Sequence, residues 1–290
     1  MDIASLVVCT AIWSTTWRAI KLQLGATPPL ESVVYRFALA SVLLFACALL
    51  TRRGLMLTRR QHLEALGQGL FNFSLQYGLV YLAEESVSSG AMAVIFAGTP
   101  FVNLVLFRLA RRQRAGPAAW IAAALGLLGV AALSLSQAHG ASASQGVTVG
   151  LGMALAGLLA ASIGNLFADR AHAEGSPLIA STAWAMTYGA GFMTLFLLAR
   201  GEPWRFEPSL RYVGALVYLA AFGSVIAFVT FYALARRRGY AFASYIAALT
   251  PPAAMAISSV TEGTRWGFGA LAGLALVLVG QAILIRRRNA

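Results

Sequence analysis

Aromatic side chains recur at helical spacing in two distant parts of this chain. Positions i, i+4 and i+8 lie on one face of an α-helix, so each set predicts a stripe of rings. Such rings form a rigid apolar wall, and a tyrosine hydroxyl in an apolar region needs a partner or a water-filled space. Binding of a small amphipathic molecule is one interpretation, and ordinary helix packing is the other. The positions are Phe73, Tyr77, Tyr81, Ser224, Phe228 and Tyr232.

Amide and indole side chains accompany these stripes. An unsatisfied amide in an apolar medium costs several kcal/mol, so Gln76 and Asn165 should face protein or a cavity. Interhelical hydrogen bonds would satisfy them as well as a ligand would. Trp13 and Trp17 share a helix face, but Trp17 also fits an interfacial belt. The candidate cavity residues are Trp13, Trp17, Phe73, Gln76, Tyr77, Tyr81, Phe96, Asn165, Phe228, Tyr232 and Tyr245.

The composition places these residues in a lipid bilayer. Apolar residues make up 59% of the chain and charged residues only 11%, with a mean hydropathy of +0.73. This is too little polar surface for a water-soluble globule. A membrane-spanning helix needs about 20 apolar residues. Ten such spans are expected, at residues 3–20, 29–50, 63–82, 86–109, 117–136, 147–168, 177–199, 212–235, 240–260 and 266–285.

The basic residues are distributed unevenly between the two sides. The net charge is +12, and most arginines fall in segments that ten spans place on one side, such as residues 52–60 and 236–238. The positive-inside rule makes that side cytoplasmic and predicts cytoplasmic termini. Glu84 and Glu85 then lie in an outer loop. Because the arginines stand at span ends without a recognition motif, we expect no nucleic-acid partner.

The chain contains an internal repeat. A constant shift of 151 residues aligns residues 81–134 with 232–285 and gives 14 identities in 54 positions. The expected units are residues 1–140 and 146–288, with five helices each. An odd number of spans inserts the second unit upside down, so the fold class is an all-α integral membrane protein with two inverted five-helix repeats. This architecture recurs in secondary transporters, where the substrate lies between the halves.

A threonine–proline pair occupies the same place in both units. Proline within a helix removes one backbone donor and crowds the carbonyl four residues earlier, here that of Phe96 or Ala247. Broken helices at corresponding places of two halves indicate a transport site, although a passive kink would look the same in the sequence. The candidate gating residues are Thr99, Pro100, Thr250 and Pro251.

These features together resemble the EamA-type branch of the drug/metabolite transporter superfamily. The resemblance rests on Trp13-Ser14, Pro28-Pro29 leading into Arg36-Phe37, the paired Thr-Pro and Glu262 ahead of Gly267. It implies an exporter of small metabolites, often amino acids, in a bacterial inner membrane, with a cavity between the halves. The chain departs from the pattern at Arg111, Arg112 and Arg114, which replace an acidic residue. It also has no membrane glutamate near Trp13 to Trp17, the residue through which small multidrug members couple to protons.

Few ionisable residues lie inside the expected spans. Arg36 is the exception. The family resemblance implies a peripheral second span, so we expect a structural role for Arg36, with Glu31 or an outer-loop carboxylate as partner. No Asp, Glu or Lys occupies a span centre, which favours neutral or zwitterionic cargo over sugar phosphates or nucleotide sugars. Drug-like compounds are a further alternative, and a monomer is compatible with the sequence.

Other functional classes find less support in the sequence. An intramembrane enzyme would need a nucleophile with its base, paired acids or a metal cluster, but His62, His139 and His172 lie at loops or span ends. Cys9 and Cys47 have no metal-ligand or disulfide spacing, and we expect neither metal nor cofactor. A channel filter motif is also missing. A sensor or assembly protein that transports nothing remains the alternative class.

Overall fold

The described part of the protein is built of helices. The computed structural model describes residues 2–25, 27–111, 116–139, 144–201, 203–239, 243 and 245–286. Arg112 and Arg114 lie outside these residues, as do the side chains of Arg111, His139 and Tyr245. The first group of elements is α1 (Asp2–Gln23), α2 (Pro29–Leu50), α3 (Arg59–Gln68), η1 (Gly69–Gln76), α4 (Tyr77–Ala83), α5 (Ser89–Phe96), α6 (Thr99–Arg111) and α7 (Pro117–His139). The second is α8 (Gln145–Ala173), α9 (Leu178–Arg200), α10 (Leu210–Tyr218), η2 (Leu219–Ile226), α11 (Ala227–Arg238), α13 (Tyr245–Glu262) and α14 (Phe268–Arg286).

Local sequence signals explain where several of these helices begin and end. Proline at the first position of α2 suits a helix start, because its missing N–H has no intrahelical acceptor there. The hydroxyls of Ser88, Ser144 and Ser209 accept hydrogen bonds from the first turns of α5, α8 and α10. Gly201 ends α9 with a φ of 69°, a backbone conformation that favours glycine.

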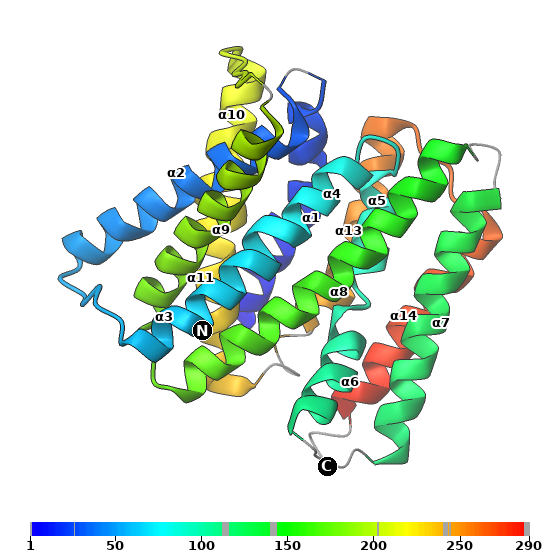
Figure 1. Cartoon of the computed structure of the whole chain (residues 1–290). Helices are drawn as coiled ribbons and strands as arrows, with labels where there is room; N and C mark the ends of the chain where they lie inside the picture. Colours follow the sequence, from blue (N-terminus) through cyan, green and yellow to red (C-terminus); the bar gives the residue numbers. More distant parts are fainter. Residues whose placement is uncertain are drawn as a thin grey trace.

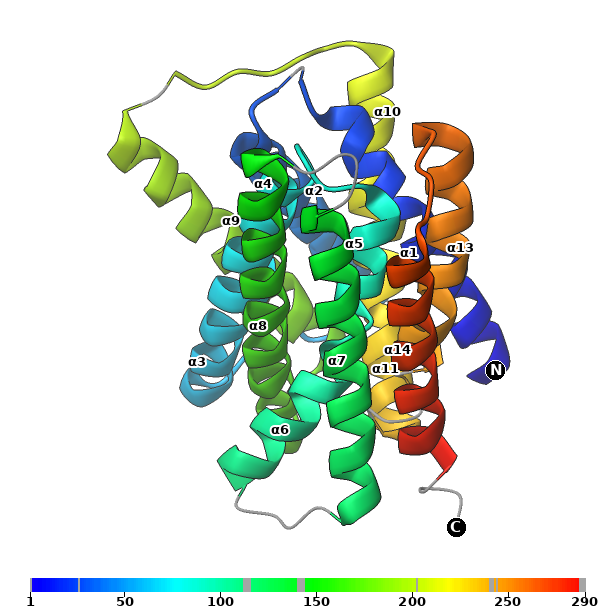
Figure 2. The ribbon, with the colours of Figure 1, turned by 90° about the vertical axis from the view of Figure 1, so that its right-hand side faces the viewer.

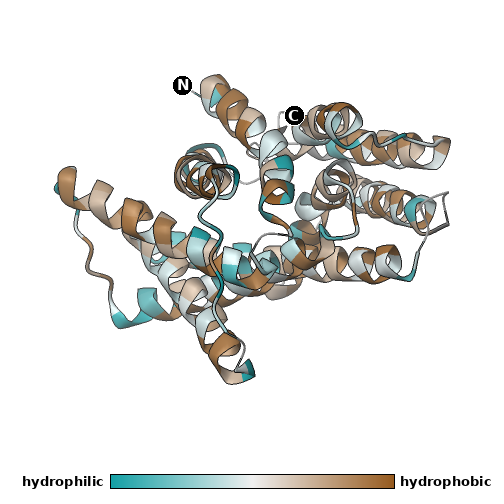
Figure 3. Cartoon of the chain, turned by 90° about the horizontal axis from the view of Figure 1, so that it is seen from above, coloured by the Kyte–Doolittle hydropathy of each residue, from teal (hydrophilic) through white to brown (hydrophobic). Residues whose placement is uncertain are grey.

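Seven helical segments are long and apolar enough to cross a membrane: Asp2–Gln23, Pro29–Leu50, Ser89–Ala110, Pro117–Ala138, Gln145–Ala173, Leu178–Arg200 and Leu210–Arg238. Large apolar side chains lie on the outside of the molecule, and Leu50, Leu210 and Phe268 are at least 85% exposed. Seen from above, hydrophobic residues make up most of the helices at the periphery, and hydrophilic residues are found in connecting segments (Figure 3). The protein is therefore a multi-pass membrane protein, while the expected total of ten spans is not confirmed.

The helices of the first unit pack against those of the second. Helix α2 packs against α9, and α7 packs against α14 (Figure 1). The first helix of the chain, α1, packs against α10, η2 and α11, and α8 packs in the same way against α3, η1 and α4. The set of packed pairs is thus the same when the two units are exchanged.

Two irregularities interrupt the helices near the centre of the molecule. Residues 69–76 and 219–226 form π-helical segments at equivalent places of the two units. A second irregularity separates α5 from α6 at Ala97 and Gly98, where Gln281 Nε2 donates to the Ala97 carbonyl over 2.9 Å. By contrast, α13 continues through Pro251. The break that the sequence predicts in both units is therefore present only in the first.

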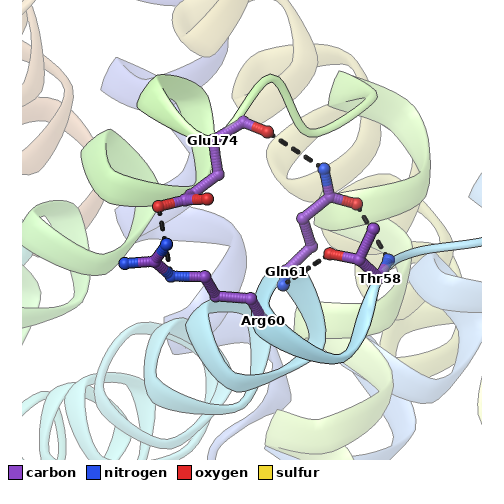
Figure 4. Close-up of polar contacts among 4 residues, drawn as sticks. All are labelled: Thr58, Arg60, Gln61 and Glu174. Atoms are coloured by element: carbon purple, nitrogen blue, oxygen red, sulfur yellow. Dashed lines mark hydrogen bonds and ion pairs between the residues drawn. The ribbon is translucent and has the colours of Figure 1, made fainter.

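The arginine-bearing helix ends meet at one end of the molecule. Here α1 and α3 begin, and α6, α8, α11 and α14 end, in the lower half of Figure 2. A capping box starts α3, since Thr58 Oγ1 accepts from the Gln61 N–H while Gln61 Oε1 accepts from the Thr58 N–H. Gln61 Nε2 also donates to the Glu174 carbonyl, and Arg60 pairs with the Glu174 carboxylate over 3.3 Å (Figure 4). We call this the arginine-rich end.

Candidate functional site

A cavity of about 670 Å³ lies between the two units. Both units contribute to its wall, through α1, η1, α5 and α6 on one side and α8, α11 and α13 on the other. Arg108, His172 and Arg236 line it at the arginine-rich end. At the other end the wall is formed by Trp17, Ile20, Val80 and Ala93. Beyond them Gln23, Glu84 and Met92 are fully buried, so the cavity is closed there.

Aromatic rings form much of the wall. The Trp13 ring packs against Phe228 and Phe231 at centroid distances of 5.5 and 5.3 Å, and its Nε1 donates to the Gly223 carbonyl. One turn further along α1, Trp17 packs against Phe96 at 5.3 Å. Ring contacts of this kind hold flat apolar surfaces in fixed orientation. The cavity therefore offers a rigid wall to an apolar group of a ligand.

Amide groups supply hydrogen-bonding capacity on the side formed by η1 and α8. Asn72 Nδ2 donates to Asn165 Oδ1 over 3.4 Å and to the Tyr232 hydroxyl over 3.1 Å. Gln68 Nε2 donates to the same hydroxyl over 3.1 Å. Gln76, which is 9% exposed, lines the cavity from the same side. Its amide and that of Asn165 are two polar groups of the wall that could serve a polar ligand.

Arg36 borders the cavity, contrary to the expectation of a peripheral residue. Its side chain is 1% exposed, and its Nε donates to Ser224 Oγ over 3.0 Å. The guanidinium carbon lies 4.5 Å from the centroid of the Tyr77 ring. Gly223 permits this position, because a Cβ there would stand 3.3 Å from Arg36 Nη2. The ion pairs formed within the described residues do not include Arg36, but the carboxyl of Glu84, in the expected outer loop, is near enough to interact with it.

The structure brings most of the predicted cavity residues together. The cavity wall includes Trp13, Trp17, Gln76, Tyr77, Phe96, Thr99, Pro100, Asn165, Phe228 and Thr250. Phe73, Tyr81 and Tyr232 do not line it, and Pro251 is also away from the wall. Phe73 is instead buried between Phe37 and Phe228. The Tyr81 hydroxyl donates to Gln23 Oε1 over 2.8 Å. The Tyr232 hydroxyl accepts hydrogen bonds from the amides of Gln68 and Asn72. That the wall residues bind substrate stays a prediction.

Sequence reasoning missed several wall residues. Arg36 had been assigned to the periphery, and Phe231 and Asp169 had not been singled out, although both line the cavity. Phe231 neighbours Tyr232 on the helix that the aromatic stripe marked, and the wall takes Phe228 from the stripe but Phe231 in place of Tyr232. Small residues such as Ala161 and Ala247 also line the cavity and give it room. Nothing in their sequence context distinguishes these alanines from the many others in the chain.

The threonine hydroxyls at the proline sites donate to backbone carbonyls. Thr99 Oγ1 donates to the Phe96 carbonyl over 2.6 Å, which is the carbonyl that Pro100 leaves without an amide. Thr250 Oγ1 donates to the Ile246 carbonyl over 2.7 Å. The Thr99 hydroxyl thus supplies the donor that Pro100 lacks, whereas Thr250 bonds the carbonyl one residue before Ala247, whose carbonyl Pro251 leaves without an amide.

The chemistry available in the cavity is that of binding. Within the described residues, no three His, Cys, Asp or Glu side chains come together as a metal site would require. The wall combines rings, amides, the buried Arg36 and charged side chains at the arginine-rich end, a mixture suited to holding a small molecule with an apolar part and a polar part.

Comparison with known proteins identifies the family. The model of the EamA-like transporter family matches residues 2–135 and again residues 148–286. The chain belongs to this family. The two matches cover nearly the whole chain and coincide with the two units that share the cavity. The resemblance proposed from Trp13-Ser14 and the paired Thr-Pro is therefore confirmed at the level of the family.

Relatives within the EamA-like family cover most of the chain. The uncharacterized inner membrane transporter YedA of Escherichia coli (strain K12) is 30% identical over 254 residues, which are 87% of this chain and 80% of that protein. Protein PagO of Salmonella typhimurium is 23% identical, covering 96% of this chain and 90% of its own length. A crystal structure of another protein superposes with a TM-score of 0.71 at 19% identity, covering 100% of this chain and 99% of the other. That likeness concerns the fold alone.

Proposed function

We propose that this EamA-like protein is a secondary transporter of the bacterial inner membrane that exports small neutral or zwitterionic metabolites, such as amino acids. The observation that carries the proposal is the 670 Å³ cavity, which both units line and which is closed at the end away from the arginines. A cavity of this size falls within the range of small-molecule sites. A site between two units is where alternating access places a substrate.

The membrane arrangement forms part of the same proposal. Ten spans in two inverted units of five, with both termini in the cytoplasm, place the arginine-rich end inside. The exchange of packed pairs between the units supports this arrangement, since α2 with α9 and α7 with α14 are pairs of equivalent helices. In this orientation the cavity faces the cytoplasm, where a metabolite to be exported would bind.

A substitution that fills the cavity tests the proposal. Ala161 lines the cavity from α8, so we expect Ala161→Trp to reduce uptake of labelled amino acids into proteoliposomes at least tenfold. Ala156 is exposed on the outside of the same helix, so Ala156→Trp is the matched control and should leave uptake within twofold. Equal uptake by both variants would contradict transport through this cavity.

The same preparation distinguishes transport from sensing. A sensor would bind an amino acid tightly, with a dissociation constant measured by calorimetry, and give no flux in liposomes that contain the protein. Flux that saturates with concentration and that Ala161→Trp abolishes excludes this alternative. Sugar phosphates, nucleotide sugars and drug-like compounds belong in the same screen, because they are the alternative cargoes.

A further inference from the structure

Arg36 carries a charge that no ion pair among the described residues neutralises, although the Glu84 carboxyl is near enough to interact with it. It lies on α2, a segment apolar enough to cross the membrane, and its side chain is 1% exposed. Its Nε donates to Ser224, but its Nη1 has no hydrogen-bond partner. None of the ion pairs among the described residues involves it. An unpaired cation at this depth is costly and marks a functional site unless a partner neutralises it.

The surroundings hold the guanidinium at the closed end of the cavity. The Tyr77 and Phe37 rings lie 4.5 and 5.2 Å from its central carbon, and Gly223 leaves the space it occupies. With 1.5 Å per residue, Arg36 is about 10 Å from the start of α2. The charge is therefore fixed in position along the cavity.

A second unpaired donor lies at the same level. Trp17 Nε1 is buried and has no hydrogen-bond partner, and the ring lines the same cavity. Trp17 is about 9 Å from the end of α1, the end that leads into α2. Two donors in the wall of one cavity, from α2 and α1 and one of them charged, are thus left unsatisfied at the closed end. Both are without acceptors in this conformation.

We infer that Arg36, assisted by Trp17 Nε1, binds a carboxylate of the transported molecule. This inference rests on the proposed transport function and names the class of cargo: compounds with a single carboxylate, including zwitterionic amino acids. A guanidinium matches the two oxygens of a carboxylate with parallel hydrogen bonds. A phosphate dianion would need more positive charge than this end of the cavity offers, because the other arginines of the wall, Arg108 and Arg236, are at the arginine-rich end.

The position of Tyr77 adds a conformational requirement. Neither Arg36 Nη1 nor Trp17 Nε1 is exposed to the cavity, and the Tyr77 ring covers the guanidinium. Cargo therefore reaches the two donors after the ring rotates or the closed end opens. A carboxylate that neutralises Arg36 in that conformation would stabilise it relative to the present one, so that bound cargo favours the transition.

Matched compounds test the inference on the wild-type protein. In proteoliposomes and by thermal shift in detergent, leucine and phenylalanine are compared with leucinamide and phenylalaninamide, and with the decarboxylated amines. We expect the carboxylates to be transported and to stabilise the protein at concentrations at least tenfold below those that the amides and amines require. Equal responses to all members of each set overturn the inference, while the proposed function stands if those members are still transported.

Variants of Arg36 provide a second test of the inference. Arg36→Gln should raise the KM for the carboxylates at least tenfold and leave any residual uptake of the amides unchanged. The KM of Arg36→Lys for the carboxylates should lie between those of the wild type and Arg36→Gln. Arg211 is exposed at the start of α10, so Arg211→Gln removes the same charge as a control and should not change the KM for the carboxylates.

A folded Arg36→Gln protein with an unchanged KM for the carboxylates overturns the inference. If Arg36→Gln does not fold, Arg36→Lys and the matched compounds decide. Carboxylate binding without flux would contradict the transport function alone.

Discussion

Glu84 is a buried carboxyl at the closed end of the cavity. Its side chain is fully buried and neither oxygen has a hydrogen-bond partner, although the next residue, Glu85, is exposed. Burial raises the pKa of the Glu84 carboxyl well above its ordinary value of 4.5, and the nearby Glu262 carboxylate adds to this. Lys21 and Arg36 oppose the shift only in part. The closed end therefore favours the protonated, uncharged form of Glu84 more than water does.

The raised pKa predicts how pH acts on the closed end. Opening hydrates Glu84 and returns its pKa toward 4.5, so the closed form binds the proton more tightly than the open form. The advantage of the closed form is complete below about 4.5 and is lost as pH rises toward the raised pKa. We expect alkaline pH at this face to increase labelling of a cysteine that replaces the buried Val87.

Substitution of the two adjacent glutamates separates this effect from other titrations. Glu84→Gln cannot ionise and should leave only the pH dependence that the thiol's own ionisation gives to the labelling rate. Glu85→Gln is the matched control, because Glu85 is exposed, and should keep the wild-type profile. A pH profile that survives Glu84→Gln would assign the dependence to another of the neighbouring groups, which are Tyr81, Glu262, Lys21 and Arg36.

Tyr232 joins helices of both units. Its hydroxyl accepts hydrogen bonds from Gln68 of α3 and Asn72 of η1, while the ring stacks on Phe228 of α11 at 5.8 Å. Removing the hydroxyl leaves the Gln68 amide buried without an acceptor, which costs about 1 to 3 kcal/mol. Asn72 keeps its bond to Asn165. We expect Tyr232→Phe to lower the melting temperature in detergent while leaving the KM for cargo unchanged.

A double substitution checks the physical reason. Gln68→Met removes the unsatisfied amide, so adding it to Tyr232→Phe should restore part of the lost stability. Additive losses in the double variant would mean that the two side chains act separately. A changed KM in Tyr232→Phe with an unchanged melting temperature would instead return Tyr232 to the binding site.

The sequence predicted the helices better than the faces they present. Apolar runs and proline starts located α2 and α9, since both signals are local in the chain. The stripe of Phe73, Tyr77 and Tyr81 assumed α-helical spacing, but η1 is a π-helix up to Gln76. A wider turn rotates the residues that follow, so Tyr77 reaches the cavity and Phe73 does not.

The position of Arg36 could not be predicted from the sequence because it depends on residues that are distant in the chain. Its position depends on Gly223 and Ser224, which lie 187 and 188 residues away in the chain, in η2. A charged residue in an apolar run was visible in the sequence, and its functional interest followed from that alone. Which side of α2 it faces is decided by the packing of α2 against η2, and no local pattern records that.

At the scale of the whole molecule, the two units have similar sequences and different shapes. The first unit is broken at Ala97 and Gly98, before Pro100, while α13 runs through Pro251 without a break. In alternating access the two units exchange shapes, so the opposite state should have α5 and α6 joined and α13 broken. The present structure would then be one of two states, open toward the arginine-rich end.

The exchange of shapes predicts opposite effects for the two prolines. Pro100→Ala restores an amide that can reach the Phe96 carbonyl, which disfavours the break and the present state. Pro251→Ala disfavours the break that α13 needs in the opposite state and therefore favours the present one. Each change should shift the equilibrium by about 1 to 3 kcal/mol, the scale of local backbone effects.

Two cysteine reporters would measure the shifts in a background without Cys9 and Cys47. Ala235 lines the cavity near the arginine-rich end, and Val87 is buried at the closed end. Pro251→Ala should increase labelling of Ala235→Cys and decrease labelling of Val87→Cys, and Pro100→Ala should do the reverse. Labelling that moves in the same direction for both prolines would mean that they only shape their helices. It would also mean that the break at Ala97 and Gly98 is a fixed feature of the first unit, and the two units would then not exchange shapes at these sites.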